Sequence, residues 1–520
     1  MKNYELIVEK QQKTIENQTK KIAKMEALIK YYETQFLLSQ RHRFGASSER
    51  VELDAQLSFF DNPEEKEAMP PPETEDVSYK RKKRKGKREE DLSNLPVVRV
   101  HYELPESERI CPECDTPMSD IGVNIRREID IIPAKAVLKE IAVHSYACHN
   151  EKCEEKHGKT TIVKAEAPKP LISGSLASAS LVSHIAYQKY SNGMPLYRIE
   201  KGFQFDGINI SRQNMSNWVI NCSENYLEAM YRLMISALLS ETELHADETT
   251  VQVLNEPGRK ATAKSYEWLY RTGAACSKPI VIYDYQETRK QAHPQEFLKD
   301  FKGFLHTDGY AGYHNLLPDI TVVGCWSHAR RYFEKQYKLL PKDRRAGTDT
   351  EKGLAYINGL FDLERKFSEL SPDERHNKRL EESKPVAEAF FAWAESLHIL
   401  PKSPLGEAVH YALTQRKYLE NVFLDGRLEL SNNRAERSVK PFVMGRKAWL
   451  FSNTPAGARA SSVMYSIIET AKENGLHPFY YVKFLLEALP NSSSADLESL
   501  LPWSPALPDF CRLPTKKEEL

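Results

Sequence analysis

The chain has 520 residues, of which 41% are hydrophobic and 28% charged, and its 73 basic residues balance its 73 acidic ones. This composition excludes an intrinsically disordered protein, and the length predicts two to four domains. No run reaches the roughly 18 to 20 apolar residues that span a bilayer, and the N-terminus lacks a secretory signal, so we expect a cytoplasmic protein. Because the net charge is zero, any affinity for nucleic acid must come from local segregation of charge.

An apolar residue recurs at every seventh position near the N-terminus. The positions are Val8, Ile15, Ile22, Ile29 and Phe36. Neither proline nor glycine interrupts the repeat, which predicts a short heptad coiled coil over residues 1–45 and a homodimer formed through it. A single amphipathic helix that packs on its own chain is the alternative.

Residues 46–95 change from an acidic, proline-rich stretch to a basic run in which eight of the nine residues 80–88 are cations. Like charges repel and leave nothing apolar to bury, so the segment is predicted to be a disordered linker. A basic run can also bind DNA phosphates. The candidates for that contact are Lys80, Arg81, Lys82, Lys83 and Arg84. A linker that only keeps the protein soluble explains the same composition.

Residues 96–165 contain two pairs of cysteines. The pairs are Cys111 with Cys114 and Cys148 with Cys153. A C-x2-C turn presents two thiolates to a metal ion, and a second pair closes a tetrahedral zinc site. Four residues separate the second pair, so His149 or His157 is an alternative ligand. We predict a structural zinc module without catalysis, because a closed site leaves no coordination position open; unrelated thiols are the alternative.

Residues 166–236 show apolar residues at helical spacing, interrupted by the sequence DGIN at residues 206–209. Ser211 is placed to cap the helix that follows. The pattern is similar to a helix-turn-helix DNA-binding region, in which Arg212 would open the helix that reads DNA. Ordinary packing of two helices joined by a loop is the alternative.

Residues 237–455 begin with runs typical of strands and later become helical. The runs are TELHADETTVQVL, SYEWLYRTG, KPIVIYDY, a helical stretch at 292–301, GFLHTDGYAGYH, and ITVVG leading into a helix. This order is that of a ribonuclease-H-like α/β sheet in a multidomain protein. A 3.6-residue period predicts an all-helical insertion over about 336–425. Residues 456–520 are expected to form a C-terminal helical segment and tail.

Three acidic residues of this region are candidate metal ligands and catalytic residues. Asp247 lies in the first strand, Asp308 ends the fourth, and Glu436 lies among cations. In the expected sheet the two strands are neighbours, so their aspartates can share metal ions. Phosphodiester cleavage and strand transfer place charge on an attacking and a leaving oxygen, which two divalent ions about 3.5–4 Å apart can hold. Asp247 would bridge the ions, and Asp308 and Glu436 would each complete one side.

Each carboxylate also has a simpler explanation. Asp308 belongs to an Asp-Gly turn, Asp247 to an exposed strand, and Glu436 stands at the spacing of a helix capping box. His245 and His306 each precede an aspartate by two positions. On an extended strand they share its face, and we expect them to pack beside it or support it.

Basic residues surround Glu436 in the segment from Ser431 to Ser452. They are Arg434, Arg437, Lys440, Arg446 and Lys447, and Arg330 and Arg331 form a second basic edge. All seven are candidates for contacts with DNA phosphates. Surface salt bridges are the alternative explanation for these arginines.

Several motifs resemble the transposases of the sixty-six family of bacterial insertion sequences. They are HADETTVQVL, HTDGYAGYH, GCWSHARRYF, LSNNRAERSVKP and SSVMYSIIETAKENGLHPFYYVKFLL, together with RFGASSER, SNGMPLYRIEKGF and the zinc knuckle. The resemblance extends over nearly the whole chain outside residues 50–95. One departure is the C-x4-C spacing of the second cysteine pair, where the family pattern is C-x2-C, and this leaves the zinc ligand set open.

The resemblance implies a DDE transposase on a ribonuclease-H-like core. Such an enzyme binds double-stranded DNA and cuts and joins it at the inverted repeats of the element, with Mg2+ or Mn2+. The family's triad falls on Asp247, Asp308 and Glu436. The resemblance also suggests small accessory proteins encoded by the same element as partners. Within the cytoplasm we expect the protein to be associated with the nucleoid.

Two other classes of protein fit part of the sequence. A DNA-binding regulator would keep the coiled coil, the zinc module and the helices without catalysis, but it has no need of all three carboxylates. Another ribonuclease-H-like nuclease or resolvase would need them, although the zipper and basic arm fit paired DNA ends better.

Overall fold

The computed structural model describes residue 18 and residues 136–147, 162–491 and 494–514. The chain divides into two compact units, Met1–Glu65 with Lys169–Leu513 and Lys66–Pro168 with Pro514–Leu520. The predicted coiled coil apart from residue 18, the basic run and the zinc cysteines lie outside the described residues.

In the smaller unit the described residues form an antiparallel pair of strands, β1 (Ser145–Ala147) and β2 (Ile162–Lys164). Tyr146 pairs with Val163, and both side chains are exposed.

From residue 169 onward, the larger unit starts with helices. They are α5 (Ala179–Ala186), α6 (Leu196–Phe205), α7 (Arg212–Cys222) and α8 (Glu228–Leu239). The predicted cap is confirmed, since the Ser211 side chain accepts a hydrogen bond from the Asn214 N–H at the start of α7. π-helical turns at Tyr187–Ser191 and Ser223–Leu227 extend α5 and join α7 to α8. The first part of the unit is therefore helical, as the spacing of its apolar residues predicts.

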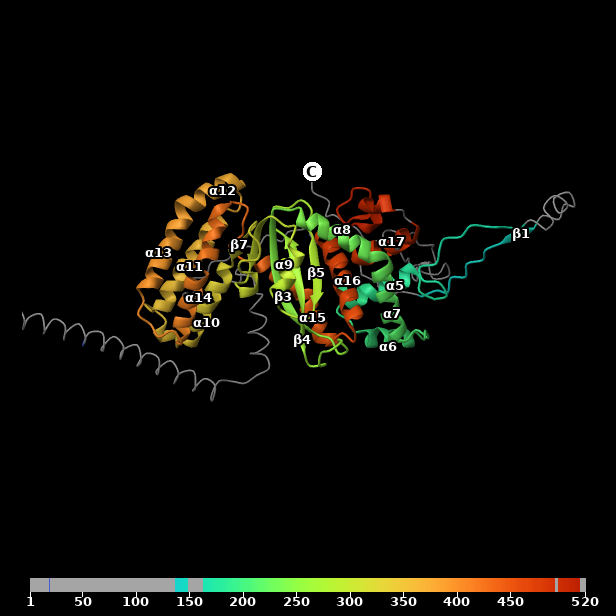
Figure 1. The fold of residues 1–520 in the computed structure, drawn as a ribbon, viewed down its shortest axis with the longest axis horizontal. Helices are drawn as coiled ribbons and strands as arrows, with labels where there is room; N and C mark the ends of the chain where they lie inside the picture. Colours follow the sequence, from blue (N-terminus) through green and yellow to red (C-terminus); the bar gives the residue numbers. More distant parts are fainter. Residues whose placement is uncertain (1–17, 19–135, 148–161, 492–493, 515–520) are drawn as a thin grey trace, which may run out of the picture. The chain divides into compact units, whose positions relative to one another are not determined.

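A mixed five-stranded sheet forms the centre of the larger unit (Figure 1). Its strands are β3 (Glu243–Gln252), β4 (Lys264–Thr272), β5 (Val281–Gln286), β6 (Gly303–Thr307) and β7 (Ile320–Gly324). The order across the sheet is β5-β4-β3-β6-β7. The first three strands run antiparallel, whereas β6 runs parallel to β3 and β7 parallel to β6. The predicted strands are all present, and β3 is central.

Helices cover both faces of this sheet. On one face lie α15 (Asn433–Trp449) and α16 (Pro455–Glu473), and the Tyr283 hydroxyl of β5 donates to the Ser438 carbonyl of α15. On the other face lies α9 (Ala292–Phe297), whose Phe297 ring stacks on Tyr270 with ring centroids 3.9 Å apart. Large aromatic and aliphatic side chains fill the space between the layers, and their burial supplies most of the stability of such a fold.

Helix α16 also closes the exposed edge of the sheet at β5. The Thr470 hydroxyl accepts from the Val281 N–H and donates to the Val281 carbonyl, both at 3.0 Å. The Ser466 hydroxyl accepts from the Tyr283 N–H at 2.8 Å. An edge strand otherwise presents unpaired backbone groups, so these two hydroxyls take the place of a neighbouring strand.

A helical insertion separates β7 from α15. Its helices are α10 (Trp326–Leu339), α11 (Asp349–Lys366), α12 (Pro372–Lys378), α13 (Lys384–Ser396) and α14 (Pro404–Leu419). They surround a second apolar core that includes Trp326, Phe333, Phe390 and Phe391. The buried guanidinium of Arg379 donates to the Leu428 and Asp425 carbonyls and pairs with Glu364. The insertion thus has its own core and is tied to the segment that leads into α15.

The last α-helix of the described residues is α17 (Pro478–Ala488), which packs against α5 and α16. Shorter 3-10 turns and one π-helical turn complete the unit. They lie at Ala311–Tyr313, Lys342–Arg344, Arg379–Ser383, Glu420–Leu424, Leu489–Asn491, Ser494–Leu500 and Asp509–Cys511. Among the helices described, none is both long and apolar enough to span a bilayer.

The edge closure predicts that Thr470→Val destabilises the larger unit. Valine keeps the shape of threonine but leaves the buried backbone groups of Val281 without partners, which costs about 1–3 kcal/mol. The measurement is urea unfolding of the full chain followed by tryptophan fluorescence. Thr470→Ser is the matched control because it keeps the hydroxyl, and equal stability of the Val and Ser variants would contradict the role of the hydroxyl.

Candidate active site

The two candidate aspartates lie at the same end of neighbouring strands. In the parallel register of β3 and β6, His245 stands opposite His306. Asp247 follows two residues later in β3, and Asp308 is the first residue beyond β6. Because parallel strands advance together, the pairing brings two residues that are distant in sequence to one edge of the sheet.

The turn after β6 holds Asp308 by its backbone and its side chain. A carboxylate oxygen of Asp308 accepts from the Tyr310 N–H at 2.9 Å, and its carbonyl accepts from the Tyr411 hydroxyl at 2.9 Å. Gly309 has φ of +93°, and a Cβ there would come within 2.8 Å of the Tyr411 hydroxyl. The Asp-Gly dipeptide is therefore a turn, as the simpler explanation proposed, and it also orients the aspartate.

Glu436 reaches the same region from the first turn of α15. Its N–H donates to the Asn432 carbonyl at 3.2 Å, and its side chain is buried. The capping-box explanation needs Asn433 as the N-cap, but Asn433 is the first residue of α15 and the N-cap is Asn432, which makes no side-chain cap bond. The capping-box explanation for Glu436 is therefore wrong. Both carboxylate oxygens lie 3.2 Å from one guanidinium nitrogen of Arg331.

The pKa of Asp247 reflects burial and the negative charges around it. Desolvation raises the pKa of Asp247 well above its ordinary value, and the negative charges of Glu248, Asp308 and Glu436 raise it further. Desolvation also raises the pKa of Glu436, against the opposing charge of Arg331. Carboxylates that raise one another's pKa share a site where a cation is favoured.

The arrangement around Glu436 includes a cysteine and a histidine from the start of α10. The ligand atoms of Cys325, His328 and Glu436 lie within 4.8 Å of one another. Burial raises the pKa of the Cys325 thiol to about 12, and burial with the charge of Arg331 lowers the pKa of His328 to about 4. The Cys325 sulfur accepts a hydrogen bond from the Asn432 N–H at 3.2 Å.

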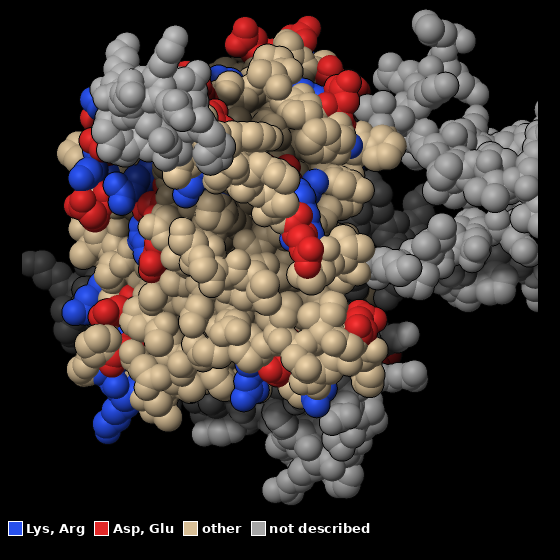
Figure 2. Space-filling model, turned by 90° about the vertical axis from the view of Figure 1, so that its right-hand side faces the viewer, with Lys and Arg blue, Asp and Glu red and all other residues tan. Residues whose placement is uncertain are grey.

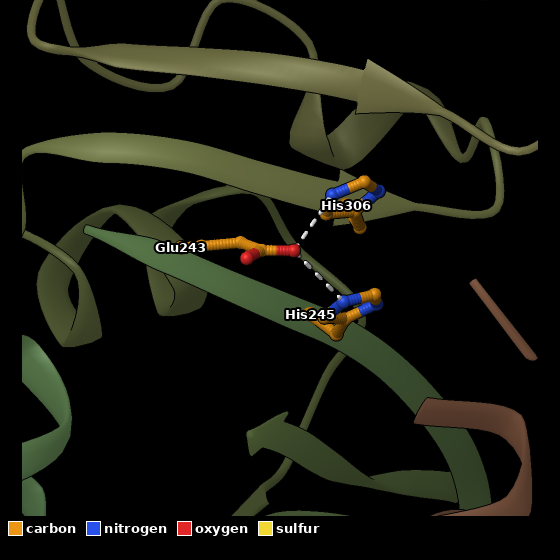
Figure 3. A group of neighbouring side chains, drawn as sticks. All are labelled: Glu243, His245 and His306. Atoms are coloured by element: carbon orange, nitrogen blue, oxygen red, sulfur yellow. Dashed lines mark ion pairs between the residues drawn. The ribbon is translucent and has the colours of Figure 1, made fainter. Parts of the chain in front are cut away.

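Glu243, His245 and His306 form a second buried group (Figure 3). Its two histidines precede Asp247 and Asp308 by two residues each. Burial alone would raise the pKa of Glu243, but the two imidazoles lower it to about 2. Burial and the charge of His245 lower the pKa of His306 to about 4. The expectation that the two histidines pack beside the aspartates agrees with this arrangement.

Sequence reasoning did not identify several residues of the site. Glu248 accepts hydrogen bonds from Tyr313 at 2.6 Å and from Arg289 at 2.8 Å, and its pKa is raised first by burial and then by Asp308. Asn432 is completely buried and links β3 to α15. The available signal for Glu248 was its position directly after Asp247. Neighbours on a strand point to opposite faces, so this signal alone did not place Glu248 in the site.

The predicted DNA-contacting residues fall into two groups. Arg434 pairs with Glu429 at 2.8 Å, Arg446 donates to Thr249 at 3.0 Å, and Arg330 pairs with Glu334 at 2.9 Å. Arg331 faces Glu436, as described above. By contrast, Arg437 and Lys447 are exposed on α15, and Lys440 is half-buried. The structure thus directs part of the basic field inward.

Arg212 is exposed at the start of α7, where its N–H donates to a carboxylate oxygen of Glu200 in α6 at 3.1 Å. From the side of α5 to α7, the surface shows mostly uncharged side chains, with basic and acidic ones scattered among them (Figure 2). On this face the described residues offer no broad basic field for DNA phosphates.

Comparison with protein families matches most of the chain. Residues 174–460 match the family described as Transposase IS66 family. Residues 466–503 match the IS66 C-terminal element, residues 108–154 the zinc-finger binding domain of transposase IS66, and residues 31–100 the Transposase C of IS166 homeodomain. The match at 108–154 supports the predicted structural zinc.

Similar proteins include three from Sinorhizobium fredii (strain NBRC 101917 / NGR234). The uncharacterized protein y4qI is 29% identical, covering 89% of this chain and 87% of its own length. The uncharacterized protein y4jD is 29% identical over 80% of this chain and 82% of its own, and y4hP is 26% identical over 74% and 71%.

Among solved structures, the Drosophila P element transposase strand transfer complex is similar at 15% identity and a TM-score of 0.35, over 56% of this chain and 92% of that chain. A likeness at this level supports no conclusion. The family match, which extends over more than half of the chain, shows that the protein belongs to the Transposase IS66 family.

Proposed function

We propose that the protein is a DNA transposase that binds the inverted-repeat ends of an insertion sequence and catalyses metal-dependent cleavage and strand transfer. The observation that carries this proposal is the meeting of Asp247, Asp308 and Glu436, in which both other carboxylates raise the pKa of Asp247. Membership of the transposase family supports DNA as the substrate.

The sheet topology supports a ribonuclease-H-like core. Three antiparallel strands are followed by β6, which joins the opposite side of β3 in parallel, and by β7 beyond it. In this arrangement the central strand and its parallel neighbour carry the two aspartates. We propose residues 237–455 as the catalytic domain, with the helices α10 to α14 inserted between its last strand and the helix of Glu436.

The three carboxylates fit divalent metal ions. They are hard oxygen donors of the kind that Mg2+ and Mn2+ bind, and their mutual repulsion in a desolvated site is relieved by positive charge. We propose that Asp247 is shared between two ions and that Asp308 and Glu436 each complete one side. When bound, such ions stabilise charge on the attacking and leaving oxygens of a phosphodiester.

The basic residues are proposed to have two different roles. Arg437, Lys440 and Lys447 lie on the helix of Glu436 and are proposed to contact DNA phosphates. Arg434 and Arg446 bond to Glu429 and to β3, so we propose that they hold α15 on the sheet. Further DNA contacts are proposed at Arg212 and at residues 80–84. A zinc ion is proposed at Cys111, Cys114, Cys148 and Cys153.

The central test is cleavage of a labelled duplex that carries the terminal repeat, with Mg2+ or Mn2+. Glu436→Gln keeps the size of the side chain but removes the charge, so cleavage should fall at least about a hundredfold, the scale on which loss of one electrostatic group acts, while DNA binding persists. Glu469→Gln on α16, where the carboxylate pairs with Lys472, is the matched control. Equal cleavage by wild type and Glu436→Gln would contradict the proposal.

A further prediction concerns the ion pair between Arg331 and Glu436. The guanidinium contacts both oxygens that a metal ion would bind, so Arg331→Ala should tighten Mn2+ binding to the DNA-free protein roughly tenfold, or about 1.4 kcal/mol. Titration of Mn2+ followed by electron paramagnetic resonance measures this affinity.

Arg330→Ala is the control for that titration, because it removes the same charge one residue earlier. Its side chain bonds to Glu334 and Asn358 instead of Glu436. If both variants bind Mn2+ with the same affinity, the ion pair does not compete with the metal.

A further inference from the structure

Glu243, His245 and His306 form a buried group next to the three candidate carboxylates. The exposed fractions of the three residues are 6%, 0% and 1%. Each imidazole turns its Nε2 atom toward the same oxygen of Glu243, at 3.6 Å for His245 and 3.3 Å for His306 (Figure 3). A Cβ at Gly273 would lie 2.4 Å from the Glu243 carboxylate. The glycine directly after β4 therefore leaves the space that the Glu243 side chain occupies.

The orientation of the two rings disfavours a shared metal ion. The rings are stacked with centroids 4.2 Å apart and planes inclined by 10°. A metal ion binds imidazole in the ring plane, along the nitrogen lone pair, and two nearly parallel planes do not meet at one ion. The group is better explained as a network of contacts within the protein.

The other nitrogen of His245 connects this group to α15. Nδ1 of His245 lies 3.0 Å from the amide oxygen of Asn432. The amide nitrogen of Asn432 donates to the Ala246 carbonyl at 2.8 Å, which fixes the orientation of the amide and assigns the proton to Nδ1. His245 therefore donates to Asn432 across two segments that are far apart in sequence.

Asn432 passes this connection to Glu436. Its carbonyl accepts from the Glu436 N–H at 3.2 Å, and its own N–H donates to the Cys325 sulfur at 3.2 Å. Asn432 thus contacts β3 through its side chain and the first turn of α15 through its backbone. A shift of its amide would move Glu436 relative to Asp247.

A second contact holds the same segment to the ring. Nε2 of His245 lies 3.1 Å from an oxygen of Glu429, and Arg434 donates to Glu429 at 2.8 Å. The two ring nitrogens of His245 therefore contact Glu429 and Asn432, the residues on either side of Leu430 and Ser431. Nε2 of His245 has no aligned hydrogen-bond partner among the described residues, so the directed bond of this ring is the one from Nδ1.

We propose that His245 is a positioning residue for the reaction, which holds Asn432 through Nδ1 and thereby places Glu436 opposite Asp247. The proposal rests on the proposed function, because it concerns the geometry of the same three carboxylates. His245 itself touches none of the reacting atoms. Its role is to tie the strand of one metal ligand to the helix of another.

Two substitutions separate the two nitrogens of the ring. Asparagine places its amide nitrogen near the position of Nδ1, whereas glutamine places it near Nε2. His245→Asn should therefore retain kcat within about threefold but lower the melting temperature, because Glu243 and Glu429 lose their shared partner. His245→Gln should keep more of the melting temperature but lose kcat about 10- to 100-fold, since small misplacement of a catalytic group has effects of this size.

The measurement is single-turnover cleavage of the terminal-repeat duplex over a range of DNA concentrations, together with thermal unfolding of each full-length variant. The apparent KM for DNA should not change, because the ring lies below the site and away from solvent. His306→Asn is the matched control: it disrupts the same stack and the contact to Glu243 but has no bond to Asn432, so its melting temperature should fall while kcat stays within about threefold.

Several results would overturn the proposal. One is a larger loss of kcat in His245→Asn than in His245→Gln; another is an equal loss in His306→Asn. A third result concerns metal content. If the wild-type protein contains a stoichiometric transition metal and both the His245 and the His306 variants lack it, the group is a metal site and the positioning role is wrong. Failure of the proposed function is a separate outcome, since Glu436→Gln would then cleave like wild type whatever the His245 variants do.

Discussion

The parallel pairing of β3 with β6 is the constraint on which the site depends. It places His245 opposite His306, and it brings Asp247 and Asp308 to one edge of the sheet. Gathering carboxylates in this way is unfavourable, because each negative charge raises the pKa of Asp247. The fold tolerates this cost because the strands below the carboxylates are held by a dense apolar core and by a buried network of imidazole and carboxylate groups.

The third carboxylate, Glu436, lies on a helix that follows the insertion, not on a strand of the sheet. The insertion α10 to α14 builds its own core around Trp326 and Phe390, and Arg379 ties its end to the carbonyls of Asp425 and Leu428. The chain can therefore leave the sheet after β7 and return at α15 without disturbing the strands. Arg331 meets Glu436 from the first helix of the insertion, so charge compensation at the site also depends on that helix.

Much of this arrangement could be predicted from the sequence. Alternating residues and short turns identified the strands, the 3.6-residue period identified the insertion, and the Asp308-Gly309 dipeptide marked a turn that the structure contains. These features are local, and local patterns reflect the backbone directly. The placement of Ser211 at the start of α7 was predictable for the same reason.

Other features could not be predicted because they depend on contacts between distant segments. The bond from His245 to Asn432 joins residues 187 positions apart, and no local pattern records it. The inward direction of Arg434 and Arg446 likewise depends on Glu429 and on β3. A run of cations in a sequence shows that charge is present, but only the packing of α15 decides which cations face the protein and which face solvent.

Asp247, Asp308 and Glu436 are proposed to form a single divalent-metal site. The most direct measurement is anomalous diffraction from crystals of the full chain grown with terminal-repeat DNA and Mn2+. We expect anomalous density at Asp247, flanked by Asp308 and Glu436, and none between the stacked rings of His245 and His306. Ordered Mn2+ elsewhere, with the three carboxylates still paired to protein side chains, would contradict it.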